Sequence, residues 1–354
     1  MAGGLMFVVA LSRRLLVKTI DAAVVGIGRI AIDAHCKALN ELEEFEFAAV
    51  CDVTPSRLEI ARDLYPKAAQ YTDYEDLLRD APVDLVVLAT PSSDHERQVI
   101  QAAQAGKHIV VEKPMCLTAE GATRMIDAAR ANGVCLTVFH NRRIDADYRL
   151  VKQTIEDGLI GAPVVIESRT HEYGYIPFAK DYVNWRLDKS AGGGLVYDWG
   201  PHIVDQMLLL AGAMPTSVYG ILLSKVYYQE TDDYFKIVLR FPDGLVGQLE
   251  STLFARIKLP RWYVLGTEGA IWSEWQSARI RTTVAGFDSE IIPDMSKGGG
   301  AGFHENTKSY YRSLHAALVN GTEPSVRPEE IRNVIRVIEA AIESSESGQV
   351  VRLS

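Results

Sequence analysis

Lys113 combines a reactive side chain with a position suited to chemistry. It follows the apolar run 108–111 and stands directly before Pro114, which biases its backbone toward an extended conformation and fixes the direction of the ammonium. A lysine held in this way can hydrogen-bond a substrate oxygen and stabilise a developing alkoxide. The competing interpretation is a surface lysine in a loop, where most lysines lie.

Asp198 and His202 form a second candidate group. They follow the glycines 192–194, which permit close ligand approach and unusual backbone angles. Pro201 fits the first position of a helix, so the two residues, four apart, are expected on one face of its first turn. A histidine can exchange a proton near neutral pH, and a nearby carboxylate can tune it. The combination favours an acid–base site over a structural histidine.

Metal chemistry has less support. Asp198, His202 and Asp205 are all ligand types, but no cysteine or second histidine lies near them in the sequence, and we predict no metal. The four cysteines are scattered and form no zinc-like cluster. They are interpreted as free thiols of a reducing compartment, which predicts a cytoplasmic protein.

A glycine-containing turn is the element that organises the rest of the chain. The apolar run 20–25 ends at Gly26, and apolar residues at helical spacing follow from residue 30 to residue 42. The first glycine allows a tight turn, the second lets a pyrophosphate approach the backbone, and the small Ala31 lets the helix pack closely. The helix N-terminus then offers free N–H groups to phosphates. The predicted contacts are Gly26, Ile27, Gly28, Arg29 and Ile30.

Asp52 strengthens the interpretation of this turn as a dinucleotide site, since a glycine turn alone is a weak signal. It ends the next apolar run and lies 24 residues after Gly28, where an acid is expected to meet the ribose hydroxyls. The alternative is a solvated acid ahead of a helix that begins at Thr54 and Pro55.

The run 83–89 has the nearly continuous apolar character of a buried parallel strand. Thr90, Pro91 and His95 follow it, and ligands of open parallel sheets bind outside the carboxyl ends of the strands. We therefore expect all three to line the dinucleotide. For His95, a helix residue facing water is an equally good interpretation.

Length and composition are typical of a two-domain globular protein: 354 residues, 47% apolar and 23% charged. A net charge of −9 argues against a nucleic-acid surface, and no apolar run has the length of a membrane span. The stretch 12–18 resembles a twin-arginine export signal. The apolar segment that such a signal needs is already the cofactor strand, so residues 1–18 are predicted to be a plain N-terminal extension.

The chain divides into two patterns. Strands alternate with helices over residues 19–140, as in a doubly wound α/β domain. Residues 141–354 instead contain short strands with turn signals, including hairpins over 235–253 and 261–275. We predict a large, mostly antiparallel sheet with helices on one face and the other face free to pair with a second subunit. The last helix, 328–346, is a candidate to pack back on the first domain.

Three motifs in order resemble the Gfo/Idh/MocA oxidoreductases, the relatives of glucose-fructose oxidoreductase and inositol dehydrogenase. They are Gly26-Ile27-Gly28, Glu112-Lys113-Pro114, and Gly194 through Asp198 to His202, and the resemblance runs from Thr19 to the end. Residues 140–143 and the pair 185–186 are similar to the branch that contains NADP-dependent scyllo-inositol dehydrogenases. The resemblance implies a Rossmann domain, then an α/β domain whose large antiparallel sheet forms homodimers or homotetramers.

The resemblance also implies roles for the candidate residues. His202 is the acid/base for the substrate hydroxyl, Lys113 orients the reacting oxygen and contacts the nicotinamide ribose, and Asp198 supports both. Glu112 lines the cofactor site. The implied substrate-binding residues are Arg142, Tyr173, Trp185, Arg186, Asp198 and His202, with the segments 171–175 and 298–304 shaping the pocket.

The chain departs from NADP-using relatives at Asp52, where they tend to have a small or basic residue. A carboxylate repels a 2′-phosphate and accepts hydrogen bonds from a free ribose diol, so we predict NAD over NADP, although Arg57 lies close enough to soften the preference. The predicted activity is a dehydrogenase that moves a hydride between nicotinamide and a ring CH–OH carbon of a sugar, polyol or inositol. Two alternatives remain: an enzyme whose tightly bound cofactor recycles between two substrates, and a non-catalytic regulator on the same fold.

Overall fold

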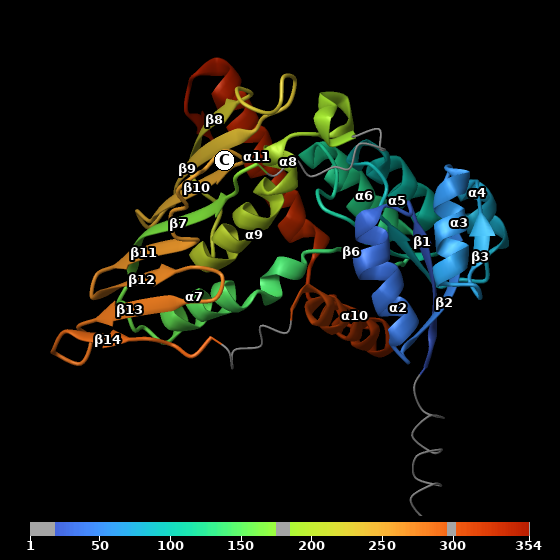
Figure 1. The fold of residues 1–354 in the computed structure, drawn as a ribbon, viewed down its shortest axis with the longest axis horizontal. Coiled ribbons are helices and arrows are strands. Elements are labelled where there is room, and N and C mark those ends of the chain that lie inside the picture. Colours follow the sequence, from blue (N-terminus) through green and yellow to red (C-terminus); the bar gives the residue numbers. More distant parts are fainter. Residues whose placement is uncertain (1–17, 175–184, 296–301, 354) are drawn as a thin grey trace, which may run out of the picture.

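A computed structural model describes residues 18–174, 185–295 and 302–353 of the protein. The predicted extension up to residue 17 and most of the glycine-rich segment 296–302 lie outside these residues. Figure 1 shows two sheets, one built by the first part of the chain and the other by the second. This is the predicted fold class, a Rossmann-type domain followed by a domain with a large, mostly antiparallel sheet.

The N-terminal sheet is six-stranded over the described residues, with every pair parallel and the order β3-β2-β1-β4-β5-β6. This is the strand order of a doubly wound dinucleotide-binding fold. The predicted strand in the run 83–89 is β4, and all of its side chains are buried. The strands are β1 (Ile20–Val25), β2 (Phe45–Cys51), β3 (Ala69–Tyr71), β4 (Leu85–Leu88), β5 (His108–Val111) and β6 (Leu136–Val138).

Helices connect these strands, and their ends follow the sequence signals. The threonine side chain at position 118 accepts a hydrogen bond from the N–H of Gly121 and caps its helix. Thr54 also precedes its helix, but its side chain makes no cap, and its N–H donates to Asp52 instead. The helices are η1 (Ala31–Cys36, a π-helix), α2 (Lys37–Glu41), α3 (Pro55–Leu64), α4 (Tyr74–Asp80), α5 (His95–Gln104) and α6 (Ala119–Ala131).

The second sheet has nine strands among the described residues, in the order β14-β13-β12-β11-β7-β10-β9-β8-β15. All its pairs are antiparallel except β7 with β10, and both predicted hairpins are present as β9–β10 and β11–β12. Its strands are β7 (Pro163–His171), β8 (Ser217–Leu223), β9 (Tyr234–Arg240), β10 (Val246–Thr252), β11 (Trp262–Gly266), β12 (Gly269–Ser273), β13 (Ala278–Thr282), β14 (Ser289–Ile291) and β15 (Val351–Arg352).

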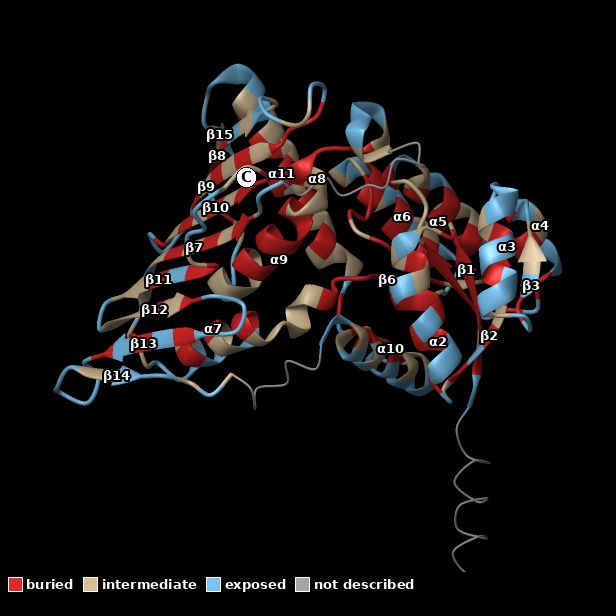
Figure 2. Cartoon of the chain, in the orientation of Figure 1, coloured by how far each residue is buried: buried red, intermediate tan, exposed pale blue. Residues whose placement is uncertain are grey.

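One face of this sheet is covered by helices. In β8, β9 and β10 the buried residues alternate with more exposed ones, which Figure 2 shows as bands across the strands. The approach is closest at Gly220, where any side chain would collide with the backbone of Ala341 on α11. The helices of this part of the chain are α7 (Ala146–Glu156), α8 (Leu195–Asp198), α9 (Gly200–Ala211), α10 (Gly302–Asn320) and α11 (Pro328–Ser347).

Helix α11 links the two halves of the molecule. It contacts β8 and α9 of the second domain and also α6 of the first. The Glu339 carboxylate accepts a hydrogen bond of 3.1 Å from the N–H of Ala119, at the start of α6. The helix ends at Gly348, whose φ of +70° continues the chain into the edge strand β15.

Candidate functional site

The glycine turn after β1 has the geometry of a phosphate-binding turn. Gly26 has a φ of +84°, and a Cβ there would lie 2.8 Å from backbone atoms of Ala89 and Thr90 in the loop after β4. Gly28 is different, because among the described residues no atom beyond Gly28 and its two chain neighbours lies within 4 Å of the place its Cβ would occupy. The first glycine is therefore required by the protein's own packing, whereas the second opens onto space that a ligand can fill.

Asp52 contacts this turn directly. Its Oδ2 accepts a hydrogen bond of 2.7 Å from the N–H of Ile27, and its Oδ1 accepts one of 2.8 Å from the N–H of Thr54. The carboxylate therefore fixes the turn between the two glycines. Each oxygen keeps a further lone pair. Ribose recognition by Asp52 stays a prediction, now with a defined position beside the turn.

His95 does not face water, so that interpretation was wrong. It is 1% exposed, with Nδ1 2.9 Å from the carbonyl of Pro114 and Nε2 3.1 Å from the carbonyl of Thr90. Burial lowers the pKa of His95, and a neutral imidazole carries one N–H for these two carbonyls. Its ring therefore joins two loops through both nitrogens, and a direct contact of His95 with the cofactor stays a prediction.

Glu112 also faces the interior. One carboxylate oxygen lies 3.0 Å from Nε2 of the buried His35, and the other accepts a hydrogen bond from the N–H of Lys113. The opposite nitrogen of His35 lies 2.6 Å from the hydroxyl of Tyr311 on α10. Burial opposes ionisation, but His35 and Lys113 hold the pKa of Glu112 below its usual range. The carboxylate supports the segment after β5 that carries Lys113, and the implied lining of the cofactor site by Glu112 stays a prediction.

Lys113 and Asp198 meet where the two domains join. The ammonium donates to the Asp198 carboxylate at 2.8 Å and to its backbone carbonyl at 2.7 Å. Burial raises the pKa of Asp198, but Lys113 and Arg186 outweigh it and bring the pKa to about 2. The carboxylate is therefore ionised at neutral pH and holds the lysine in one place. This pairing brings together two residues that sequence analysis had predicted separately.

The glycines ahead of Asp198 serve the protein's own packing. Gly192 and Gly194 have φ values of +82° and +103°, which confirms the predicted unusual backbone angles. A Cβ at Gly193 or Gly194 would collide with protein atoms, in the second case with the Asp232 carboxylate. That carboxylate accepts a hydrogen bond of 2.7 Å from the N–H of Val196 and so holds the start of α8. The close approach predicted for a ligand is made by Asp232, which sequence analysis missed.

His202 lies beside the pair but is not tuned by Asp198. The helix breaks at Trp199, so Asp198 ends α8 and His202 belongs to α9, which corrects the predicted shared face. His202 is 6% exposed, and its Nδ1 is buried without a hydrogen-bond partner within the described part of the chain. Burial, then Lys113 and Arg142, lower its pKa well below the usual value. The imidazole is therefore neutral near pH 7 and able to accept a proton.

Arginine and tryptophan side chains surround this centre. The Arg142 guanidinium lies 4.3 Å from the ring centre of Trp199 and 5.4 Å from that of Trp275. The Trp199 ring meets the His202 ring edge-on at 6.0 Å. Sequence analysis missed both tryptophans. Trp199 follows the predicted Asp198 directly and could have been identified from the sequence. Trp275 lies in a hairpin turn, and no sequence signal marks it.

The remaining predicted substrate residues are less well defined by their contacts. Arg186 lies 3.8 Å from the Asp198 carboxylate and stacks on the ring of its neighbour Trp185 at 4.4 Å. Tyr173 is about half exposed, and its ring lies 4.7 Å from the guanidinium of Arg256. Part of the segment 171–175 and most of 298–304 lie outside the described residues.

Asp205, considered above as a metal ligand, is bound by cations instead. Its carboxylate forms two hydrogen bonds with the guanidinium of Arg143, at 2.6 and 2.8 Å. Burial raises the pKa of Asp205, but His140 and Arg143 bring it to about 2. The three acids and bases of the hypothetical metal site therefore have separate surroundings, two of them ion-paired with basic side chains.

Known proteins have sequences related to this chain over most of its length. Residues 20–140 match the family model of an oxidoreductase family with an NAD-binding Rossmann fold, and residues 148–272 match the GFO/IDH/MocA C-terminal domain. The scyllo-inositol 2-dehydrogenase (NADP(+)) of Bacillus subtilis is 30% identical, over 95% of this chain and 97% of its own. The scyllo-inositol 2-dehydrogenase (NAD(+)) of the same organism is 28% identical, over 94% and 96%.

The solved structures give the same result. An NAD-binding protein from Listeria innocua superposes with a TM-score of 0.84 at 32% identity, over 95% of this chain and 97% of its own. The fold and the site define an NAD(P)-dependent oxidoreductase. The chain belongs to the Gfo/Idh/MocA family.

Proposed function

We propose that this oxidoreductase is a dehydrogenase for a ring CH–OH group of a sugar, polyol or cyclitol. The observation that carries the proposal is the pairing of Lys113 with Asp198, 2.8 Å apart, beside a neutral and buried His202. These three groups are a fixed cation, an anion that holds it, and a base. They are what the removal of a proton from an alcohol requires.

The open space at Gly28 and the backbone N–H groups after it suit the pyrophosphate of a dinucleotide, and a bound nicotinamide supplies the hydride acceptor. His202 accepts the hydroxyl proton through a ring nitrogen. Lys113 donates a hydrogen bond to the same oxygen and stabilises its negative charge as the C–H bond breaks and the ketone forms. Asp198 keeps the ammonium in position throughout.

The substrate class rests on the relatives and on the surroundings of the centre. Two relatives bear the name scyllo-inositol 2-dehydrogenase. Trp199 and Trp275, with Arg142 against both, offer ring faces for the C–H surface of a cyclic polyol and a guanidinium for its hydroxyls. Arg186 supplies a second guanidinium, 3.8 Å from the Asp198 carboxylate.

We infer that NAD is preferred over NADP. The relatives include enzymes named for each cofactor. Asp52 supports the choice of NAD, because a carboxylate already bonded to the turn at Ile27 cannot move away from a 2′-phosphate without releasing that bond. The affinities for NADH and NADPH, measured by quenching of tryptophan fluorescence, test this inference, and equal affinities would refute it.

We also propose assembly through the second sheet and a cytoplasmic location. The face of the sheet opposite α11 carries half-exposed Tyr219, Ile221 and Leu223 on its strand β8, and Tyr263 on β11. Such a face suits a second copy of the chain in a homodimer or homotetramer. Light scattering of wild type and of Ile221→Asp tests the assembly, with a monomeric wild type as the refuting result.

The four cysteines support the cytoplasmic location. All four are unpaired, as a reducing compartment favours.

The decisive experiment follows nicotinamide absorbance with NAD and NADP against inositols, aldoses and sugar acids. Lys113→Ala is expected to lose at least 100-fold in kcat, within the range that proton-transfer and charge-stabilising groups contribute. Lys107→Ala, at the opposite end of β5, is the matched control and keeps full activity. Full turnover by Lys113→Ala would refute the assigned roles.

Other outcomes separate the rival functions. A nicotinamide cofactor that stays with the protein through purification, and changes redox state with each of two substrates, would indicate recycling. Cofactor binding without turnover of any compound, together with a stable protein partner, would indicate a regulator.

A further inference from the structure

His140 connects the candidate base to a network of charges between the domains. It follows β6, is 1% exposed, and its ring meets the His202 ring edge-on with centres 5.6 Å apart. On its other side, Nδ1 lies 3.5 Å from a carboxylate oxygen of Asp205, one turn after His202 on α9. That separation is long for a hydrogen bond and close enough for a strong electrostatic contact.

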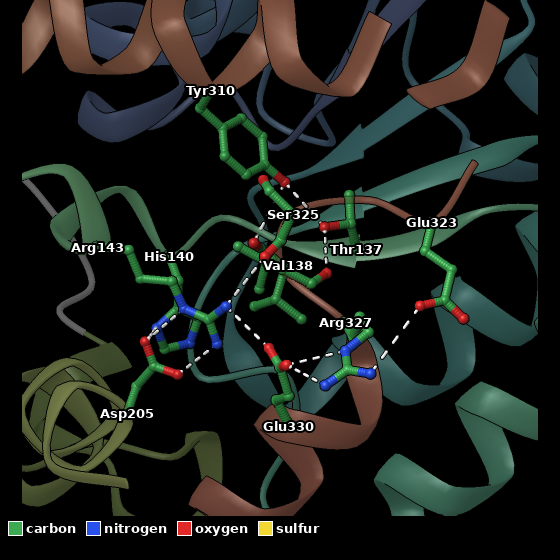
Figure 3. A network of polar contacts seen from close by, with 11 residues as sticks. Thr137, Val138, His140, Arg143, Asp205, Tyr310, Glu323, Ser325, Arg327 and Glu330 are labelled. Atoms are coloured by element: carbon green, nitrogen blue, oxygen red, sulfur yellow. Dashed lines mark hydrogen bonds and ion pairs between the residues drawn. The ribbon is translucent and has the colours of Figure 1, made fainter. Parts of the chain in front are cut away.

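Asp205 is itself held from the other side. Arg143 binds it through two nitrogens and also donates to Glu330 on α11 at 2.9 Å and to the carbonyl of Ser325 at 3.1 Å. Arg327 extends the network by binding Glu330. Figure 3 shows His140 and Arg143 both directed at the Asp205 carboxylate, with Glu330 beyond. The network fixes Asp205, and Asp205 fixes the ring of His140.

Filling space alone does not require an imidazole at position 140. Neither ring nitrogen of His140 has a hydrogen-bond partner among the described residues, and the same is true of Nδ1 of His202. Buried polar atoms without partners destabilise a fold, and a phenyl ring of similar shape avoids that cost. The imidazole of His140 therefore lowers the stability of the fold. Its position between Asp205 and the candidate base His202 indicates a role other than packing.

We propose that His140 is a positioning residue. Asp205 and Arg143 fix the ring of His140, and this ring in turn keeps the imidazole of His202 oriented and uncharged for proton abstraction. The proposal rests on the proposed function of His202 as the base. It assigns a role in the reaction to His140, which the sequence connected only with a branch of the family.

Four basic groups face His202 from the elements around it: Lys113 at the end of β5, Arg142, His140, and Arg261 ahead of β11. Together with burial they lower the pKa of His202. Replacing His140 by phenylalanine removes one of the four. The pKa of His202 is then expected to rise, so that the base is lost at a higher pH as the solution is acidified.

The test compares His140→Phe with Glu330→Gln. Phenylalanine keeps the ring shape but loses the contact with Asp205, whereas Glu330→Gln weakens the network at its far end without touching either histidine. We expect His140→Phe to lower kcat about tenfold with KM within roughly twofold, because orientation and protonation of a base affect the chemical step. The acid limb of the pH–rate profile moves to higher pH. Glu330→Gln keeps the wild-type limb.

A second readout needs no turnover. In protein with isotopically labelled histidine, the His202 ring signals are assigned by their loss in His202→Gln and followed by NMR through a pH titration. The proposal expects titration at higher pH in His140→Phe. Unchanged His202 titration in His140→Phe would overturn it, as would wild-type kcat with an unmoved limb. His140→Gln replaces the phenylalanine variant if circular dichroism shows that the latter does not fold.

The two readouts separate this proposal from the proposed function. A wild-type protein without turnover on the whole substrate panel refutes the dehydrogenase, while the NMR titration still decides whether His140 acts on His202. Turnover in wild type with an unmoved titration refutes only the role of His140.

Discussion

Asp205→Asn is a direct test of the charge network that joins the two domains. The substitution keeps the shape of the side chain but removes the negative charge that Arg143 binds with two hydrogen bonds. Arg143 keeps its hydrogen bond to Glu330, so the guanidinium loses part of its interactions but still has a negatively charged partner. The side chain of Asp205 is 3% exposed, so water does not replace the lost interaction.

The size of the effect follows from the pKa of Asp205, which lies at about 2 in the folded protein against an ordinary 3.8. At 1.36 kcal/mol per pKa unit, the ionised carboxylate stabilises the fold by roughly 2–3 kcal/mol. Because its pKa is lowered by folding, this stabilisation is complete above about pH 5 and disappears as the pH falls toward 2. At pH 3 about half of it remains.

Urea unfolding followed by tryptophan fluorescence measures the effect, since all five tryptophans lie beyond residue 184 and report on the second domain. Asp205→Asn is expected to lower the free energy of unfolding by roughly 2–3 kcal/mol at pH 7 and by about half as much at pH 3. Asp127→Asn, whose partner Arg130 is exposed, is the control and changes it by less than about 0.5 kcal/mol. A loss that is equal at both pH values would refute the electrostatic argument.

Three further predictions concern the cofactor site and the base. Gly26→Ala is expected to lose at least about 2 kcal/mol of stability in the same assay, because of the positive φ of Gly26 and the close backbone of Ala89 and Thr90. Gly28→Ala is expected to keep wild-type stability but to bind NADH at least about tenfold more weakly. Equal stability losses would contradict this distinction. Asp52→Ser should reduce the NADH-to-NADPH affinity ratio by at least about tenfold in fluorescence titrations; an unchanged ratio counts against a ribose contact. The oxidation rate should stay flat through neutral pH and fall only below the usual histidine range, since the pKa of His202 is lowered; a fall between pH 8 and 7 contradicts a neutral base.

Local signals predicted the fold well. The nearly continuous apolar run 83–89 contains a fully buried parallel strand, and the helix predicted over 328–346 is α11, Pro328–Ser347. The two hairpins also follow from adjacent residues. These features succeed because periodicity, turn residues and caps act over a few positions, which a single sequence displays directly.

The contacts within the site were less accessible, because they join residues far apart in the chain. Lys113 and Asp198 are 85 positions apart, and Arg143 and Asp205 are 62 apart. The types of these residues suggested chemistry, but nothing in the sequence states which acid binds which base. Asp198 was accordingly expected to serve His202, and the Gly200 and Pro201 at the start of α9 do not reveal that Asp198 binds Lys113 instead.

The division of the site between the domains gives the interface a part in the chemistry. Lys113 follows strand β5 of the N-terminal sheet, whereas Asp198 ends α8 and His202 lies in the first turn of α9, both in the second domain. The proposed catalytic lysine thus comes from one domain, whereas the base and the carboxylate that binds the lysine come from the other. The relative position of the domains therefore sets the distance between Lys113 and His202, and helix α11 with the Arg143–Asp205 pair fixes that position. Substitutions in this network are expected to alter kcat even where each domain keeps its own fold, because an error of about 1 Å in the placement of reacting groups is costly.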